Sequence, residues 1–373
     1  MSIQKRILII GGGFSGMSAA ILLAGAGHSV DLVEIDPGWR SYGAGISLNG
    51  AIFRVFHRLG ILDTFKGLGA MTDGVEVRGP ADQVFARIPT PALQEGATGT
   101  GGIMRPVLAK ILSERVRATK TNVRLGLSVS ALDNRADGVR ATFTDGTAAD
   151  YDLAIGADGL YSQTRAMLFP DAPKPRYIGQ AVWRAVLERQ AHLPTVAMWM
   201  GPKLKVGINP VSDTHAYLFL TEDRPTNDHV PSETHVAVLK DLLSRFPSPT
   251  IQAVAAGLGA GSQVVYRPLE QLLLPRPWFA NRVVLIGDAV HATTPHMAAG
   301  AMIGMEDAVV LAEEIAARGI EGALPAFQDR RWERCRLVVE NSGRLAEIEQ
   351  GHGTQEEHQR LMGQTLGALA APA

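Results

Sequence analysis

A chain of 373 residues with 46% hydrophobic and 20% charged residues has ample material for one large domain or two closely associated ones. Its net charge of −1 gives no electrostatic basis for binding nucleic acid or an anionic membrane. The single cysteine, Cys335, excludes an intramolecular disulfide, a CxxC redox pair and a multi-cysteine zinc site, and we expect no metal centre. No run approaches the ~18 apolar residues of a membrane span, and no secretory signal is visible, so we expect a cytoplasmic protein.

The N-terminal segment predicts a strand–helix–strand unit. "KRILII" (5–10) is a β-branched apolar run bounded by glycines, which is typical of a buried parallel strand. "SGMSAAILLAGAG" follows with helix-forming residues, and "SVDLVE" (29–34) is a second strand. Three elements within thirty residues make a βαβ unit with a right-handed crossover.

The remaining chain alternates between helical and strand patterns. Strand patterns near 74–88 precede a helix at about 103–119, and a strand-rich region then runs to 156. An antiparallel pattern covers 178–220, followed by a helix near 233–246, a buried strand at 282–286 and two long C-terminal helices. We therefore predict an α/β fold: a Rossmann-type layer with an inserted, mainly antiparallel β domain and C-terminal helices. The predicted nucleotide-binding domain comprises residues 1–72, 98–175 and 270–325, the inserted domain 73–97 and 176–269, and the C-terminal helices 326–373.

The first motif is "GGGFSG", a GxGxxG pattern formed by Gly11, Gly13 and Gly16, with Phe14 and Ser15 between the last two glycines. The first glycine permits a tight turn, the second lets backbone amides approach a pyrophosphate, and the third allows close helix–strand packing. The motif lies between a strand and a helix, which is the context that supports it. Glu34 ends the next strand, where a carboxylate accepts hydrogen bonds from ribose hydroxyls and disfavours a 2′-phosphate. FAD or NAD therefore fits better than NADP.

Two further motifs follow buried strands. In "DLAIGADGLYSQTR" (152–165), Asp158 and Gly159 alone indicate only a turn. In "RVVLIGDAVHATTPHMAAGAMIGMEDA" (282–308), Asp288 comes at the carboxyl end of a strand, where α/β folds bind ligands. Pro295 interrupts any helix there, and a new helix is expected to begin near Ala299 or Gly300.

Together, these motifs and their order resemble the FAD-dependent aromatic hydroxylases, the single-component flavin monooxygenases of the p-hydroxybenzoate hydroxylase type. The match covers nearly the whole chain and includes "GAGISL" (43–48), "MRPVL" (104–108), "GADG" (156–159) and "GDAVHATTPHMAAG" (287–300). It implies FAD as cofactor, with NAD(P)H, O2 and a small phenolic or N-heteroaromatic substrate as partners. It also implies that reduced FAD forms a C4a-hydroperoxide whose distal oxygen attacks the ring. We expect a monomer or a homodimer.

The resemblance also assigns roles to residues of this chain. It implies that the three glycines hold the FAD pyrophosphate, that Glu34 binds the adenosine ribose, and that Arg105 reaches the pyrophosphate region. It associates Asp158 with FAD and the passage of NAD(P)H, and it places Asp288 on the ribityl or pyrophosphate side. The remaining cofactor contacts are expected at the flavin ring, from Gly43, Gly45, Pro295, Gly300, Ala301 and Met302.

The chain departs from the family pattern at two places. Many members have Gly-Gln-Gly or Gly-Ala-Gly where this chain has Gly300-Ala301-Met302. Some pyridine- and phenol-hydroxylating members place a histidine where this chain has Ser47, so substrates that depend on that histidine are not assigned.

A base near the ring would favour electrophilic attack by deprotonating a substrate hydroxyl. The candidates are His296, which is expected beside the flavin, and Tyr217 and His215, which share a face of one strand. Arg184 is a candidate partner for a substrate carboxylate. The alternatives are a reductase or dehydrogenase of the same fold and a non-catalytic flavin- or NAD-binding protein.

Overall fold

The computed structural model describes residues 4–41, 43–201 and 203–373. The first of its two large sheets has six strands and is parallel except for one edge strand. The buried β-branched run at 6–10 forms the central strand, and the expected βαβ unit is present. In sheet order, the strands are β18 (Phe279–Ala280), β19 (Val283–Leu285), β12 (Leu153–Gly156), β1 (Arg6–Ile10), β2 (Ser29–Glu34) and β8 (Asn122–Leu125).

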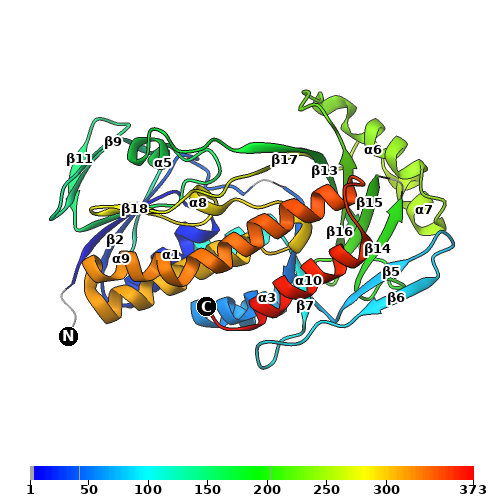
Figure 1. Ribbon diagram of the computed structural model, residues 1–373, viewed down its shortest axis with the longest axis horizontal. Helices are drawn as coiled ribbons and strands as arrows, with labels where there is room; N and C mark the ends of the chain where they lie inside the picture. The colour runs from blue at the N-terminus through cyan, green and yellow to red at the C-terminus, as the bar shows by residue number, and fades with distance from the viewer. Residues whose placement is uncertain (1–3, 42, 202) are drawn as a thin grey trace.

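The second large sheet has seven strands and is mainly antiparallel. Only the pairing of β14 with β5 is parallel. In sheet order, its strands are β17 (Val264–Gln271), β13 (Arg176–Glu188), β16 (His215–Asp223), β15 (Leu204–Pro210), β14 (Val196–Gly201), β5 (Val75–Arg78) and β6 (Val84–Ile88). Figure 1 shows this sheet, mostly in green, at the opposite end of the molecule from the blue strands of the first sheet.

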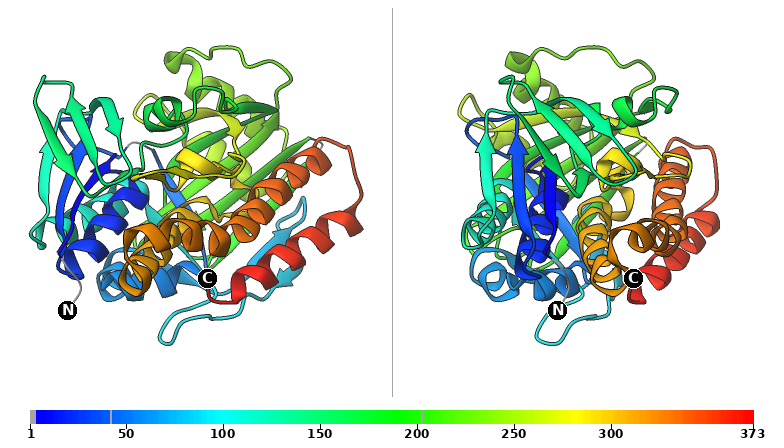
Figure 2. Two further views of the ribbon diagram at one scale, coloured as in Figure 1. Left: turned by 60° about the vertical axis from the view of Figure 1, so that its left-hand side comes forward. Right: turned by 90° about the vertical axis from the view of Figure 1, so that its left-hand side faces the viewer.

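Two three-stranded sheets complete the β structure. One comprises β11 (Ala148–Tyr151), β10 (Val139–Phe143) and β9 (Val129–Asn134), at the outer end beside β1 and β2 (Figure 2). The other comprises β3 (Gly45–Asn49), β7 (Thr100–Met104) and β4 (Ala70–Thr72).

Helices pack on both large sheets and connect them. They are α1 (Phe14–Gly25), α2 (Ile52–Leu59), α3 (Leu62–Leu68), α4 (Arg105–Arg117), α5 (Gln163–Leu168), α6 (His235–Ser244), α7 (Pro249–Gly257), α8 (Asp288–His291), α9 (Gly300–Glu349) and α10 (Gln355–Ala370), with 3-10 turns η1 (Ser232–Thr234) and η2 (Pro295–Met297). The predicted fold class is confirmed, and α9 begins where a new helix was expected. No helix in the described ranges is both long and apolar enough to cross a membrane.

The long helix α9 packs against α1 and α10 and runs across both halves of the molecule (Figure 1). The predicted boundary at 325/326 falls inside this helix. The backbone instead leaves helical geometry at Gly319, where φ is 67°, a value that glycine adopts at little cost. The division into domains otherwise stays a prediction.

Two main apolar cores correspond to the two large sheets. One contains β1 and α1 with the first part of α9, and the other lies between the seven-stranded sheet and helices α6 and α7. Trp183 and Trp199 are buried in the second core, on the sheet face that packs against α6 and α7. Residues that alternate with these tryptophans therefore face the other way, towards the six-stranded sheet.

Candidate active site

A cavity of about 670 Å3 lies between the two large sheets. One side is formed by the turn after β1, the end of β2 and the segment from Asp288 to Ala301. The other side is formed by one face of the seven-stranded sheet and by α10. Thirteen residues predicted for the site line it: Gly13, Phe14, Ser15, Glu34, Gly45, Arg105, Arg184, Tyr217, Asp288, Pro295, His296, Gly300 and Ala301.

The glycine turn leaves room for a phosphate at the N-terminus of α1. At Gly11, φ is 106°, and a Cβ atom would lie 2.4 Å from the carbonyl oxygen of Ala157. At Gly16, a Cβ atom would lie 2.0 Å from the carbonyl oxygen of Gly11. At Gly13, by contrast, a Cβ atom would meet nothing within 4 Å. The first and third glycines thus shape the turn, and Gly13 faces open cavity beside the free N–H groups that begin α1.

Glu34 is fixed on the cavity wall by backbone hydrogen bonds. Its Oε2 accepts from the N–H of Gly12 at 2.7 Å, and its Oε1 accepts from the N–H of Asp36 at 2.7 Å. The Nε1–H of Trp39 donates to the carbonyl of Gly12 at 2.8 Å and closes the turn. A carboxylate held in this way suits ribose hydroxyls and repels a 2′-phosphate.

Arg105 and Asp288 place opposite charges deep in the cavity. The guanidinium of Arg105, at the start of α4, lies 5.2 Å from the ring centre of Phe14 in the glycine turn. Burial lowers the pKa of Arg105 and raises the pKa of Asp288. The Arg105 guanidinium as donor, the carboxylates of Asp288 and Glu34 as acceptors and the open side of Gly13 fit the FAD that the sequence implies.

The side chain of Asp158 does not line the cavity, but it stabilises a turn that forms part of the cavity wall. Its carboxylate accepts from the hydroxyl of Ser162 at 2.5 Å and from the N–H of Thr164 at 2.9 Å, so it fixes the turn that follows β12. Gly159, the next residue, does line the cavity. Arg165 links this turn to the third motif by donating to the carbonyl of Ala289 at 2.9 Å.

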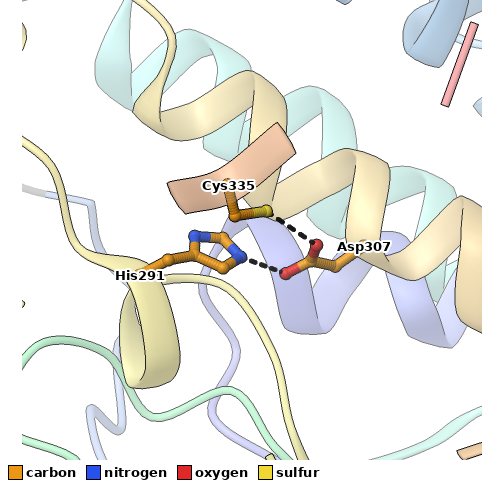
Figure 3. A group of neighbouring side chains, drawn as sticks. All are labelled: His291, Asp307 and Cys335. Atoms are coloured by element: carbon orange, nitrogen blue, oxygen red, sulfur yellow. Dashed lines mark hydrogen bonds and ion pairs between the residues drawn. The ribbon is translucent and has the colours of Figure 1, made fainter. Parts of the chain in front are cut away.

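A buried ionic network lies behind the third motif. Asp307 on α9 accepts from the N–H of Gly287 at 2.8 Å and lies 2.6 Å from Nε2 of His291 (Figure 3). Burial disfavours the charged form of both side chains, but the attraction between them is stronger. The pKa of His291 is therefore raised well above its usual value, and the pKa of Asp307 is lowered. The acid pair Glu306-Asp307 therefore supports the loop that carries Asp288.

His291, Asp307 and Cys335 are close enough together to suggest a metal site (Figure 3). Arg331 already supplies the positive charge: its Nε lies 2.7 Å from Oδ1 of Asp307, and its terminal nitrogen lies 3.4 Å from the sulfur of Cys335. The same guanidinium donates to Glu306 at 2.5 Å. The cluster is therefore an internal ion-pair network.

Tyr217 projects from β16 into the cavity. Its ring packs on Gly45, where a Cβ atom would lie 2.5 Å from Cδ1 of the tyrosine. Its hydroxyl lies 3.1 Å from Oγ of Ser47, which in turn accepts from Nδ2 of Asn209 at 2.9 Å. Ser47 is the position where the chain departs from the family pattern. Its side-chain hydroxyl positions the hydroxyl of Tyr217.

His296 lines the cavity in front of a second buried charge network. Its Nδ1 lies 2.8 Å from Oγ1 of Thr294, and its Nε2 lies 3.4 Å from Oε2 of Glu349. The other oxygen of Glu349 is 2.5 Å from Nζ of Lys205, which also lines the cavity. Burial lowers the pKa of His296 despite this carboxylate. Burial alone would raise the pKa of Glu349, but Lys205 and His296 hold it below its usual value.

Besides Gly11, Gly16 and Asp158, three predicted site residues do not line the cavity. His215 shares the strand face of Tyr217, but it begins β16 at the exposed end, and its Nδ1 lies 2.8 Å from the hydroxyl oxygen of Thr214. The side chain of Met302 is 1% exposed in the core because the third residue of α9 turns inward. Gly43 also lies outside the lining, with Arg105 3.4 Å from where its Cβ would be.

No motif in the sequence points directly to Lys205, to Glu349 or to the part that α10 plays in the cavity. Met362, Leu366 and Leu369 of α10 all line the cavity. Glu349 did carry one signal: it is the last residue of α9, where the helix dipole disfavours an acid unless a cation compensates.

Comparison with known proteins agrees with this geometry. The family model described as "FAD binding domain" matches residues 4–342. A 3-amino-4-hydroxybenzoate 2-monooxygenase from Streptomyces cremeus is 32% identical, with 92% of this chain and 87% of the relative covered. A FAD-dependent urate hydroxylase from Klebsiella oxytoca is 30% identical, with 96% and 95% covered.

A solved structure shares both the fold and the cofactor. The crystal structure of Klebsiella pneumoniae HpxO complexed with FAD and uric acid has a TM-score of 0.83 and 26% identity, and the alignment covers 98% of this chain and 97% of the other. The family match, the identities over nearly full length and the FAD-shaped cavity lead to one conclusion: the chain belongs to the FAD-dependent aromatic hydroxylase family.

Proposed function

We propose that the protein uses NAD(P)H and O2 to hydroxylate a small phenolic or N-heteroaromatic ring in the part of the cavity between Tyr217, His296 and the seven-stranded sheet. The observation that carries this proposal is the single cavity that combines the FAD cradle at Gly13 with an enclosed, largely apolar sheet face. We infer that it acts in the cytoplasm as a monomer or homodimer.

When bound, FAD would supply the redox chemistry, in which two electrons from NAD(P)H reduce O2 so that one oxygen atom enters the substrate and the other leaves as water. The chain supplies the surroundings. Gly300 and Ala301 begin α9 and line the cavity, so the free N–H groups of this helix start stabilise negative charge on the reduced cofactor.

The walls opposite the helix start keep water away from the reacting atoms. Val75, Val196 and Met198 line the cavity from the sheet, and Leu93 lines it from the loop after β6. A dry site strengthens each electrostatic interaction within it and protects reactive species from hydrolysis.

We assign proton handling to His296 and Tyr217. Because burial lowers the pKa of His296, the imidazole is neutral at neutral pH, and it can take the proton of a substrate hydroxyl through the cavity-lining Thr294, whose Oγ1 lies 2.8 Å from Nδ1 of His296. Glu349 behind it stabilises the imidazolium that results, at an Nε2–Oε2 distance of 3.4 Å. Tyr217, held by Ser47, donates or accepts a hydrogen bond at the ring.

The FAD-loaded protein should be tested with a panel of hydroxylated benzenes and pyridines. We expect one or more compounds to accelerate NAD(P)H oxidation and to yield a product heavier by one oxygen atom. Accelerated oxidation without an oxygenated product would instead support a reductase of the same fold. Failure to bind FAD would contradict any flavoenzyme function.

A further inference from the structure

Strand β6 (Val84–Ile88) forms one edge of the seven-stranded sheet. Among the described strands it pairs only with β5, and Figure 1 shows it as the outermost strand, below β14 and β5. All five of its residues are exposed, and three of them are large and apolar: Val84 (39% exposed), Phe85 (66%) and Ile88 (47%). The outer row of backbone N–H and C=O groups is therefore open to another strand, beside side chains that favour burial.

The opposite edge of the same sheet is built differently. Strand β17 carries Pro268, which has no backbone N–H, and the exposed charge of Arg267. Helix α6 packs against this strand, and Nδ1 of His235 lies 3.3 Å from the carbonyl oxygen of Val264. Proline, charges and a covering helix are the means by which proteins keep a sheet edge from pairing. Strand β6 has one charge, Arg87, and no proline, so its edge lacks this protection.

The sequence of β6 is complementary to itself when two copies run antiparallel. If a two-fold axis passes through Ala86, Phe85 of one copy lies opposite Arg87 of the other, and Val84 lies opposite Ile88. A guanidinium is attracted to the face of an aromatic ring, and the apolar pair buries surface. A pairing centred on Arg87 would instead place two like charges opposite each other, which is unfavourable. The residue pattern therefore selects one register.

Phe85 and Arg87 both extend from the sheet edge. The register of β6 against β5 shifts beside Phe85, so this residue has no partner on β5. Arg87 lies 3.1 Å from the carboxylate of Glu76, but Glu76 is 5% exposed and also binds Arg78 at 2.6 Å. The side chain of Arg87, by contrast, is 76% exposed. Arg87 thus shares its counter-charge and keeps its outer side towards solvent.

We infer that two copies of the chain associate through β6, which pairs antiparallel with its counterpart about a two-fold axis at Ala86 and joins the two seven-stranded sheets. A two-fold contact is closed, so it forms a dimer and no larger assembly. One five-residue strand offers less area than the roughly 800 Å2 per partner of a standard interface, so we expect a Kd of about 1–100 µM. The inference goes beyond the proposed function and does not depend on it.

Sedimentation velocity of the FAD-loaded protein, from about 1 to 200 µM, measures the association. We expect wild type to pass from monomer to dimer over this range. Phe85→Lys places a like charge opposite Arg87 of the other copy, whereas Phe85→Glu places an opposite charge there. At low ionic strength, the Kd of Phe85→Lys should be at least about tenfold higher than that of Phe85→Glu.

Two comparisons make this contrast specific to the proposed contact. General repulsion between copies would act in the other direction, because the chain has a net charge of −1, which Phe85→Glu makes more negative. The control variant is Leu68→Lys, which changes an apolar residue that is 48% exposed on α3. It should leave the Kd at the wild-type value.

A disulfide crosslink tests the register. The one native cysteine, Cys335, is 0% exposed, so it should not contribute. Ala86→Cys places two thiols opposite each other on the axis, at a Cα separation that a disulfide can span. Val84→Cys is the matched control on the same strand, because its counterpart lies four residues along, roughly 13 Å away. We expect mild oxidation to give covalent dimer at least about tenfold faster in Ala86→Cys than in Val84→Cys.

Three results would overturn the inference. The first is a protein that stays monomeric over the whole concentration range. The second is a dimer to which Phe85→Lys and Phe85→Glu make the same difference, because the contact would then lie elsewhere. The third is crosslinking of Val84→Cys as fast as that of Ala86→Cys, because β6 would then not pair in the register centred on Ala86.

Discussion

The carboxylate of Asp307 accepts a hydrogen bond from the backbone N–H of Gly287 at 2.8 Å, across a separation of 20 residues. Gly287 immediately precedes Asp288, which lines the cofactor cavity. Arg331 holds the other oxygen of Asp307 at 2.7 Å from the second half of α9. The position of the cofactor loop therefore depends on an ion pair that never touches the cofactor.

Replacing Arg331 should destabilise the whole protein. Arg331 is 0% exposed, and Arg331→Met removes the guanidinium that Glu306 and Asp307 share, so these buried carboxylates keep only Arg334 and His291 as charged partners among the described residues. We expect the free energy of unfolding to fall by about 3–5 kcal/mol, measured by urea denaturation. The control is Arg336→Met on the same helix, whose exposed ion pairs should contribute less than about 1 kcal/mol. Equal losses in both variants would contradict a special role for the network.

Adding a methyl group at Gly13 should weaken FAD binding without disturbing the fold. The backbone at Gly13 is extended, with φ −73° and ψ −176°, and no protein atom lies within 4 Å of the added Cβ, so alanine fits the empty protein. The methyl group would instead occupy the space for the pyrophosphate. We expect Gly13→Ala to raise the FAD dissociation constant at least about tenfold, by titration of apoprotein.

The matched control for that variant is Gly25→Ala at the other end of α1. Its Cβ also meets nothing within 4 Å, and it is remote from the cavity lining. FAD affinity should be unchanged there. An unchanged affinity in Gly13→Ala as well would show that the pyrophosphate binds elsewhere.

The hydroxyl of Tyr217 can be separated from the hydrogen bond that holds it. Tyr217→Phe removes the hydroxyl from the cavity, whereas Ser47→Ala removes only the partner at 3.1 Å. If the hydroxyl contacts the reacting ring, we expect kcat to fall about 100-fold in Tyr217→Phe and much less in Ser47→Ala. Rates are to be measured under single turnover with product quantified. Equal effects of the two variants would assign Tyr217 a packing role on Gly45.

Glu349 should set the pH dependence of the reaction through His296. The proposed role of His296 as the base requires a neutral imidazole, so the rate is expected to fall as the pH decreases through its pKa, which burial holds below 6.5. Glu349 raises that pKa and Lys205 lowers it, so Glu349→Gln should move the acid limb of the kcat profile to lower pH. Glu347→Gln changes an exposed acid that lies two residues before Glu349 and pairs with Arg344, and it should leave the limb in place. An acid limb that persists in His296→Asn would exclude His296 as the titrating group.

The glycine turn and Glu34 could be predicted from sequence because strand, turn and helix are neighbours along the chain. The pairing of Tyr217 with Gly45 and the exposure of His215 could not, because both depend on where β16 ends and how it is placed against β3. Met302 illustrates the same limit: the sequence located the start of α9 but not its rotation. Lys205 and Glu349 meet across 144 residues, and no local pattern records that contact.

The last helix, α10, is a place where substitutions can alter the shape of the cavity. Three of its side chains, Met362, Leu366 and Leu369, form part of the cavity wall, while Arg54 and Arg334 hold its final carbonyls at 2.7–2.8 Å. It contributes no strand to the sheets and no residue to the glycine turn. Substitutions along α10 can therefore enlarge or reshape the space for a ring without altering the cofactor cradle. Substrate preference can therefore change, in evolution or by engineering, independently of FAD binding.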